Sequence, residues 1–493
     1  MGTREATSTP AGRLRPLNAA SVRADGGFVL YWMVAQRRLH ANFALQFAVE
    51  RAAALGRPLV ILEALRIGYP WASDRLHRFV LDGMAEHATA LRDGPVRYYP
   101  YLEPSEGAGG GLLEALAARA CEVVTDDYPA FFVPRMTAAA ARRSPVRLTA
   151  VDGNGLHPMR GAPKAYPTAY LFRRALQAAL PADLEAFPRP DPLAEAPRLA
   201  PPDLSEVERH WPPLRDAHTV DLGALTIDHG VTPAPARGGH TAGVERLARF
   251  VAAPLDGYGQ ARNHPDDDGS SGLSPYLHFG HLGAHEVAAA VLAREGWTPD
   301  RLASRVTGAK AGWWGLSAGA ESFLDELVTW RELGFNWSVR HPDDADAYET
   351  LPEWARRTLD RHAADAREYV YDLGEFAAAA THDPLWNAAQ RQLVREGRIH
   401  NYLRMLWGKK VLEWAPTPRD ALATMLELNN RYALDGRDPN SSSGIGWVLG
   451  RYDRPWAPER PVYGVVRYMS SENTARKLRL RGYLARYGAD TEG

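Results

Sequence analysis

The chain of 493 residues contains one cysteine, Cys121. A single cysteine excludes an intramolecular disulfide and a metal site built from several thiolates. The scarcity of cysteine also fits a reducing cytoplasm. The apolar neighbours Ala120, Val123 and Val124 favour a packed core thiol over a nucleophile. We therefore expect a cytoplasmic protein whose chemistry does not depend on thiols, and we predict no metal site.

Long apolar runs are also missing. No stretch approaches the roughly 18 consecutive apolar residues of a membrane span. The N-terminal region carries Arg4, Arg13 and Arg15 but lacks the apolar core of a signal peptide. We therefore expect neither membrane insertion nor export.

The chain also lacks an excess of charge of either sign. With 58 Lys and Arg against 59 Asp and Glu, the net charge is −1, which does not by itself indicate a nucleic-acid partner. Local patches set the field that DNA meets, however, and residues 451–486 hold nine basic side chains against three acidic ones. A solvated helix face would account for part of this excess, and phosphate binding is the alternative. The nine are Arg451, Arg454, Arg460, Arg467, Arg476, Lys477, Arg479, Arg481 and Arg486.

The first third of the chain alternates short β-branched runs with helical segments. Strands are predicted at residues 28–32, 58–62, 96–102, 122–125 and 146–151, and helices at 42–54 and 74–91. This alternation predicts a parallel, doubly wound sheet in an α/β, Rossmann-like domain. The glycine run 107–111 lacks the third glycine of a dinucleotide-binding motif, so we interpret it as a flexible loop. The domain is predicted to span residues 27–185, after an N-terminal extension of residues 1–26.

The remainder of the chain has a different character. Ten prolines between residues 188 and 235 predict a long, irregular connection, which we take as an interdomain linker over residues 186–240. From residue 241 onward the apolar residues follow helical spacing almost everywhere, without strand alternation. Residues 241–493 are therefore predicted to form an all-α domain, and no internal repeat is evident.

Residues 400–414 are the most informative segment. Four apolar side chains recur at helical spacing, namely Leu403, Trp407, Val411 and Trp414. Beside this stripe, Asn401 and Arg404 lie one turn apart and face the same way. Two indoles next to an amide and a guanidinium predict a helix built around a flat ligand with polar edges. Core packing is the alternative for tryptophan at this spacing; the chain has 14 tryptophans in all, enough for a cavity lining or for a large core.

Three further segments carry dense polar patterns. Residues 428–440 contain amides, arginines and aspartates too closely spaced for an ordinary connection. Residues 270–280 join a hydroxyl-rich turn to a helix predicted to begin near Pro275, with a serine as its cap, and could bind a phosphate. Glu326 and Trp330, at positions i and i+4, pair a hydrogen-bonding carboxyl with a stacking surface. A core tryptophan with Glu326 paired to a nearby arginine is the alternative.

Together these motifs resemble the photolyase/cryptochrome family. The resemblance rests on Ser271-x-Leu-Ser-Pro-Tyr-Leu-His-Phe-Gly, on Asp-Glu-Leu-x-x-Trp-Arg-Glu-Leu at 325–333, on His-Asn-x-x-Arg-Met-x-Trp at 400–407, and on Leu-Asn-x-Arg-Tyr-x-Leu-Asp-Gly-Arg-Asp-Pro-Asn at 428–440. The last two, with residues 444–447 and 452–456, are similar to class II cyclobutane pyrimidine dimer photolyases in particular. The resemblance covers nearly the whole chain, but residues 126–142 and 151–173 depart from the family pattern, which leaves a second, antenna chromophore open.

The resemblance implies an FAD, active in its reduced form, inside the helical domain. The residues that would bind the cofactor are Tyr258, Arg262, Ser271, Leu273, Ser274, Arg331, Asn401, Arg404 and Asp435. Asn429 would face the flavin N5, with Asn440 as the alternative. Trp407 and Trp386 match positions that relay electrons to the flavin.

The resemblance also implies the substrate, a cyclobutane pyrimidine dimer in UV-damaged DNA. Glu326 would hydrogen-bond the dimer, Trp330 and Trp447 would pack against its bases, and Arg454 and Arg467 would fill the space that it leaves in the duplex. Damaged bases are the least costly to extrude, and aromatic side chains then replace lost stacking. We therefore predict light-driven repair by a deoxyribodipyrimidine photo-lyase, located in the cytoplasm or at the nucleoid of a bacterium, with no obligate protein partner.

Two alternatives remain at this point. A cryptochrome-type photoreceptor without catalysis would be expected to carry a signalling tail, whereas this chain stops soon after Tyr487. It would also tolerate the loss of Glu326, which is present. Repair of (6-4) photoproducts is the other alternative.

Overall fold

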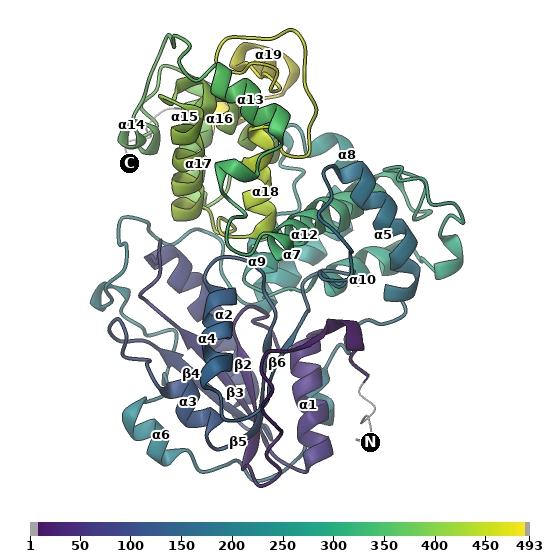
Figure 1. Cartoon of the computed structure of the whole chain (residues 1–493), viewed down its shortest axis with the longest axis vertical. Coiled ribbons are helices and arrows are strands. Elements are labelled where there is room, and N and C mark those ends of the chain that lie inside the picture. The colour runs from purple at the N-terminus through teal and green to yellow at the C-terminus, as the bar shows by residue number, and fades with distance from the viewer. Residues whose placement is uncertain (1–7, 489–493) are drawn as a thin grey trace. The chain divides into compact units, whose positions relative to one another are not determined.

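The computed structural model describes residues 8–488 and is shown in Figure 1. The described chain forms two compact units. An α/β unit comprises residues 8–162, 179–245 and 273–290, and a helical unit comprises residues 163–178, 246–272 and 291–488. The units interleave along the sequence, so their boundaries differ from the predicted ones.

The α/β unit is built on a six-stranded sheet in the order β1-β6-β5-β2-β3-β4. The strands are β1 (Leu14–Pro16), β2 (Phe28–Met33), β3 (Leu59–Leu65), β4 (Arg97–Leu102), β5 (Ala120–Asp126) and β6 (Leu148–Val151). Strands β2 to β6 pair in parallel, which confirms the predicted α/β fold class. β1 pairs antiparallel with β6, so part of the predicted N-terminal extension is an edge strand of a mixed sheet.

Strand β2 is buried along its whole length because both faces of the sheet are covered. Val29, Tyr31 and Met33 point into a core shared with α1 (Phe43–Leu55). The alternate residues enter a second core with α3 (Leu112–Ala117) and α4 (Val133–Arg143). Figure 1 shows α1 on one side of the strands and α3 and α4 on the other. Helix α2 (Asp74–Leu91) lies on a third apolar cluster with Leu65.

The proline-rich segment is not a free linker. It contains the helix α6 (Ser205–His210) and two short 3-10 helices, Pro192–Glu195 and Leu222–Ala224, and its apolar residues enter the cores of the α/β unit. Ala196 joins the α1 side of the sheet, and Leu204 and Val207 join the other side. Proline limits the regular secondary structure of the segment to these short helices but does not prevent burial, so the segment packs along the α/β unit.

The remaining helices lie wholly or partly in the helical unit, except α9, which lies in the α/β unit. They are α5 (Ala169–Asp183), α7 (His240–Ala252), α8 (Pro254–Ala261), α9 (Ser274–His278), α10 (Ala284–Arg294), α11 (Ala318–Leu324), α12 (Arg331–Arg340), α13 (Glu353–Arg361), α14 (Leu373–Ala377), α15 (Pro384–Glu396), α16 (Asn401–Trp414), α17 (Pro418–Tyr432), α18 (Pro439–Val448), α19 (Ser471–Lys477) and α20 (Arg481–Tyr487). Helices α5, α7 and α10 contain residues of both units. Among residues 8–488, no helix has the length and hydropathy that crossing a bilayer requires.

Two local predictions need correction. The i and i+4 spacing assigned to Glu326 and Trp330 assumes an α-helix, but both residues lie on a π-helix, Asp325–Trp330, which separates α11 from α12. The helix near Pro275 has Leu273 as its N-cap and no side-chain cap, because Ser274 is already its first residue. The predicted serine cap is therefore wrong.

Candidate functional site

A buried polar cluster joins three helices of the helical unit. The Asn429 amide on α17 donates to the Gly436 carbonyl at 2.8 Å and to the Ser441 hydroxyl on α18 at 3.0 Å. Arg404 on α16 donates to Ser441 at 3.3 Å and to Asp435 at 3.2 Å. The structure thus brings together three of the predicted flavin-lining residues, and it adds Ser441, which sequence reasoning missed.

The two candidate asparagines differ in their surroundings. Asn429 is 4% exposed, whereas the Asn440 side chain is exposed and its backbone N–H serves only to cap α18 through Asp438. The turn between them approaches α17 so closely that a Cβ at Gly436 would lie 2.4 Å from the Asn429 carbonyl. This turn therefore requires glycine and holds Asp435 beside Arg404.

His400 directly precedes α16 and is a second feature that sequence reasoning missed. Its side chain is 4% exposed, and within residues 8–488 neither ring nitrogen has a hydrogen-bond partner. Burial lowers the pKa of His400 to about 4, so the ring is neutral at pH 7. A buried imidazole without a partner is unusual in a folded protein and points to a ligand with polar groups. Asn401, next to it, opens α16 with an exposed side chain.

Arg246, which no sequence motif indicates, holds the turn that was predicted to bind a phosphate. Arg246 donates from Nε to the Ser271 carbonyl at 2.6 Å and from Nη2 to the Ser270 carbonyl at 2.8 Å. Gly272 follows with φ of +65°, and a Cβ there would collide with Arg246. Leu273 and Ser274 belong to the α/β unit, whereas Ser271 belongs to the helical unit.

Glu326 lies on the π-helix with 30% of its side chain exposed, and its Oε1 is 2.5 Å from Nη1 of Arg262. Removal from water raises the pKa of Glu326, and the Arg262 guanidinium opposes that shift. Arg262 also lies 5.4 Å from the ring of Tyr258, which is buried beside it. The arginine partner expected in the alternative interpretation is thus present, but the carboxylate remains accessible. Trp330, at the end of the π-helix, is half-buried.

Arg331 follows Trp330 at the start of α12. Its guanidinium is buried and lies 4.5 Å from the centre of the Phe335 ring.

Two tryptophans form a stacked pair inside the helical unit. The rings of Trp386 on α15 and Trp407 on α16 have centroids 6.4 Å apart and planes 6° from parallel. The Trp386 indole N–H donates to the Trp407 carbonyl at 3.0 Å. Trp414 lies 6.0 Å from Trp386, and Tyr371 lies 5.8 Å from Trp414, nearer the surface. Closely spaced aromatic rings therefore run outward from Trp407.

Basic side chains surround Trp447 on α18. Arg467 lies 5.4 Å from the Trp447 ring and 4.1 Å from the Trp456 ring, and its Nε is 3.2 Å from Asp453. Arg454 is exposed and lies 4.9 Å from Trp456. A cavity of about 330 Å³ opens beside Trp447, Trp456 and Arg467.

Lys409 lies under the same ring and was not predicted. Its ammonium is 5.1 Å from the centre of the Trp447 ring and donates to the Val448 carbonyl at 2.5 Å. The side chain is fully buried, and this burial lowers the pKa of Lys409 to about 7, although Asp453 raises it.

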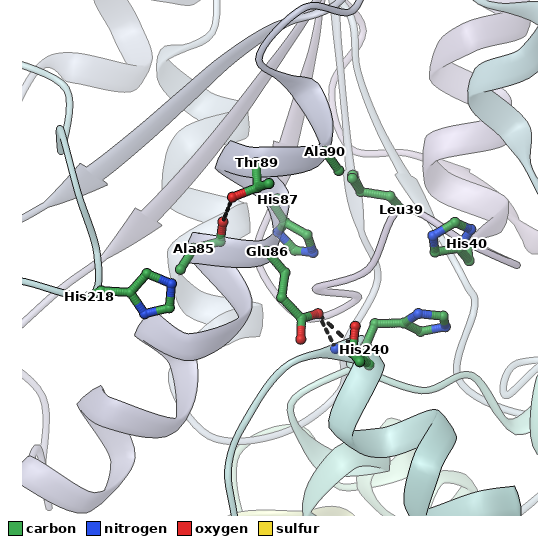
Figure 2. A pocket seen from close by; sticks show the side chains of 10 residues that line it. Leu39, His40, Ala85, Glu86, His87, Thr89, Ala90, His218 and His240 are labelled. Atoms are coloured by element: carbon green, nitrogen blue, oxygen red, sulfur yellow. Dashed lines mark hydrogen bonds between the residues drawn. The ribbon is translucent and has the colours of Figure 1, made fainter.

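The α/β unit has a separate, histidine-lined cleft of about 340 Å³. Figure 2 shows the rings of His40 and His240 lying against one another, with centroids 4.6 Å apart, and His218 on the opposite side. Glu86 between them accepts hydrogen bonds from the backbone N–H groups of His240 and Thr241. Among the described residues, no three His, Cys, Asp or Glu side chains are grouped so that they could hold a metal ion.

Similar proteins define the class to which this fold and site belong. The chain is 33% identical to a deoxyribodipyrimidine photo-lyase of Methanothermobacter thermautotrophicus, over 97% of this chain and 98% of that protein. It is 31% identical to the deoxyribodipyrimidine photo-lyases of Arabidopsis thaliana, over 97% and 93%, and of Potorous tridactylus, over 91% and 79%. No protein-family model matches the chain. A crystal structure of a bacterial class III photolyase from Agrobacterium tumefaciens shares the fold, with a TM-score of 0.65 and 19% identity over 95% of this chain and 87% of that one.

The chain belongs to the deoxyribodipyrimidine photo-lyase family. It is therefore an enzyme of light-driven DNA repair and a flavoprotein, as the family implies. The residues of the helical unit fit FAD. The polar groups of Asn429, Arg404 and Asp435 are of the kind that the edge of an isoalloxazine ring would need, and a polar ligand would supply the partners that the buried His400 ring lacks.

The buried Lys409 predicts a pH dependence of stability. In the unfolded chain a lysine has a pKa of about 10.4, above the folded value of about 7. Between these pH values the unfolded chain binds more protons at this site, so Lys409 makes the free energy of unfolding rise with pH. Urea unfolding of Lys409→Met at pH 7 and pH 9.5 should show a smaller rise than the wild type, by on the order of a few kcal/mol. An equal rise in the free energy of unfolding of both proteins would contradict a lowered pKa of Lys409 in the folded protein.

Proposed function

We propose that this enzyme splits cyclobutane pyrimidine dimers in UV-damaged DNA, in the manner of the class II photolyases that its motifs resemble. The observation that carries the proposal is the accessible Glu326, held by Arg262 beside Trp330. Burial favours its protonated form and the arginine its ionised form, so the carboxyl can exchange hydrogen bonds with a polar, electron-accepting base. The chemistry that reduced FAD supplies when bound is the light-driven donation of one electron to the dimer.

The cofactor contacts that we propose lie in the helical unit. Tyr258, Arg262 and Ser271 would hold the diphosphate and ribityl region, and Arg331, Asn401, Arg404 and Asp435 would line the flavin. For the contact to N5 we favour Asn429 over Asn440, since only Asn429 is buried in the polar cluster. Leu273 and Ser274 remain predictions from the resemblance alone.

The remaining side chains have roles outside the flavin. Trp407 and Trp386 would carry electrons inward when oxidised FAD is photoreduced. Trp330 and Trp447 would pack against the extruded bases, and Arg454 and Arg467 would enter the opened duplex. A second chromophore in the α/β domain, predicted as residues 27–185, and a cytoplasmic location are parts of the proposal that rest on the resemblance and composition.

A direct test irradiates the purified, reduced enzyme with blue light in the presence of oligonucleotides that carry a defined lesion. Restoration of thymines from a cyclobutane dimer is expected. Repair of a (6-4) photoproduct instead, or of neither lesion, would favour one of the two alternative functions.

Glu326→Ala should retain FAD but split several-fold fewer dimers per absorbed photon, because a hydrogen bond to the electron-accepting lesion is lost, at a site that the bound lesion would shield from water. Glu326→Gln keeps a hydrogen-bonding group and should lose less. The measurement is the quantum yield of repair under blue light, with flavin absorbance as the check on cofactor content. A quantum yield equal to that of the wild type in Glu326→Ala would remove the role assigned to this residue.

Trp407→Phe should block the light-driven reduction of oxidised FAD by an external reductant, and Trp386→Phe should slow it strongly, because the stacked pair is the proposed route. Both variants should still repair dimers when FAD is reduced chemically beforehand. Trp297→Phe, a control in the same unit, should photoreduce normally. If pre-reduced Trp407→Phe held FAD but repaired nothing, Trp407 would have a structural or substrate-binding role instead.

Arg454→Ala and Arg467→Ala should weaken binding to a dimer in duplex DNA more than to a dimer in a single strand, because only the duplex leaves a gap to be filled. A contact to phosphate alone predicts comparable losses on both substrates and a salt slope reduced by about one unit. The exposed Arg476 on α19 offers a control of that second kind. Titrations at two salt concentrations distinguish the two roles, and equal losses would rule out gap filling.

A further inference from the structure

We propose that Arg173 and Asp325 are positioning residues of the repair site: their buried ion pair ties α5 to the π-helix and sets the direction in which Glu326 and Trp330 face the substrate. This inference rests on the proposed function, because it assigns a task to the segment that carries both residues. The two partners are separated by 152 residues in the sequence, so no local pattern predicts them.

The ion pair has the two-pronged geometry that arginine makes with a carboxylate. Nε of Arg173 donates to one carboxylate oxygen of Asp325 at 2.6 Å, and Nη2 donates to the other at 3.0 Å. The side chains are 7% and 9% exposed. Two parallel hydrogen bonds fix the orientation of the carboxylate as well as its distance. Asp325 is the first residue of the π-helix, so its backbone is fixed at the point where the wide turn begins.

The same face of α5 also holds a loop. The remaining Nη1 of Arg173 donates to the Gly308 carbonyl at 3.2 Å. Gln177, one turn further along α5, accepts from the Gly308 N–H at 2.7 Å and donates to the Ala309 carbonyl at 3.0 Å. Each of the three guanidinium nitrogens of Arg173 therefore has a hydrogen-bond partner. Helix α5, the loop and the π-helix form one hydrogen-bonded assembly.

A π-helical turn needs such support. The π-helix is rare, occurs mostly as a single turn within α-helices, and is frequent at functional sites. Here it is followed without a break by α12, and the Arg331 N–H donates to the Glu326 carbonyl five residues back. A relaxation to ordinary α-helix would turn Glu326 and Trp330 relative to α11. The Arg173–Asp325 pair opposes this relaxation because breaking it would leave a buried charge without a partner.

The Asp325 member of the ion pair also affects the protonation of Glu326. Arg262 and Lys310 lower the pKa of Glu326, and Asp325 raises it through repulsion between the two carboxylates. Tyr258 also faces Glu326. Burial raises the pKa of Tyr258, and the Glu326 carboxylate raises it further. Removing the Asp325 charge should therefore move the titration of Glu326 to lower pH, in addition to releasing the π-helix.

The test replaces the partners singly and together with apolar residues of similar size: Arg173→Met, Asp325→Leu and the double variant, with Asp325→Asn as a milder change. Each single variant leaves a buried charge and should lower both Tm and the quantum yield. The double variant removes both charges, and such a replacement is often neutral for stability. We expect its Tm to return close to the wild-type value while the quantum yield of dimer splitting stays several-fold lower. Asp325→Asn, which removes the negative charge and leaves Arg173, should in addition shift the pH midpoint of the yield downward.

The α/β unit offers a matched control in the buried pair Arg51 and Glu122, whose side chains are 12% and 1% exposed. Replacing that pair by Met and Leu should likewise leave Tm close to the wild-type value, and it should change neither the yield nor its pH midpoint. Hydrogen exchange of the amides of residues 325–331 should increase only in the variants at Arg173 and Asp325.

Each outcome has a separate meaning. If the Arg173→Met/Asp325→Leu variant regains both Tm and the wild-type yield, the pair contributes only stability and the inference is wrong. If the wild-type enzyme itself repairs no dimer under blue light, the proposed function fails, and this inference fails with it.

Discussion

A polar or charged group that leaves water needs a partner inside the protein, and the helical unit is organised around this requirement. Asn429, Ser441, Arg404 and Asp435 satisfy one another and thereby fix α16, α17 and α18 at one place. Removing one member would leave the others buried and unsatisfied, so these side chains specify the geometry of the site as much as they offer contacts to a ligand. His400 is the exception in this region, and an exception of this kind is where a ligand has most to contribute.

The same requirement is met at the carboxyl end of the sheet, where a buried carboxylate finds its partners. In doubly wound folds, ligands bind in the crevice where the strand order reverses, which here lies between β2 and β5. Asp126, at the end of β5, accepts from the backbone N–H groups of residues 34–36 after β2. Gln36 donates in turn to Asn154. A second chromophore at that crevice would have to break these bonds, whereas the histidine-lined cleft is already open (Figure 2).

Much of the fold was predictable because its signals are local. Buried strands such as β2 and β5 are short β-branched runs, and the stripe of Leu403, Trp407 and Val411 marks α16 without further information. The π-helix was not predictable, since the spacing of Glu326 and Trp330 suits an α-helix, and Asp325, where the wide turn begins, pairs with Arg173, which is far away in sequence. β1 has only three residues, and its pairing with β6 is set by the sheet and not by its own propensity. The proline-rich segment was predicted as a long, irregular connection, and its packing was not predictable because the partners of Ala196, Leu204 and Val207 lie far away in sequence.

Predictability within the site follows the same division. The residue types that line it, including Arg404, Asp435 and Asn429, stand out because amides and charges are dense in sequence around them. Arg246, Ser441 and Lys409 do not stand out, since each acts through a distant partner: a turn carbonyl, an amide on another helix, or an indole ring. Sequence patterns therefore identify groups that face a ligand better than groups that hold those groups in place.

The surroundings of Trp447 show how a chain with a net charge of −1 can still approach DNA. Arg467 is shared between Asp453 and the rings of Trp447 and Trp456, and it keeps 37% of its side chain exposed. Asp453 is 10% exposed, but it also accepts from the Arg454 backbone N–H at 2.9 Å and from the Trp456 indole N–H at 3.1 Å. It would therefore keep partners if Arg467 turned toward a phosphate or an opened duplex. The aromatic rings that Arg467 vacates would at the same time become free to stack on bases. In the proposed function, one movement of Arg467 would therefore uncover the stacking surface and supply the basic group, and the Lys409 ammonium beneath Trp447 would hold the indole in place while Arg467 leaves.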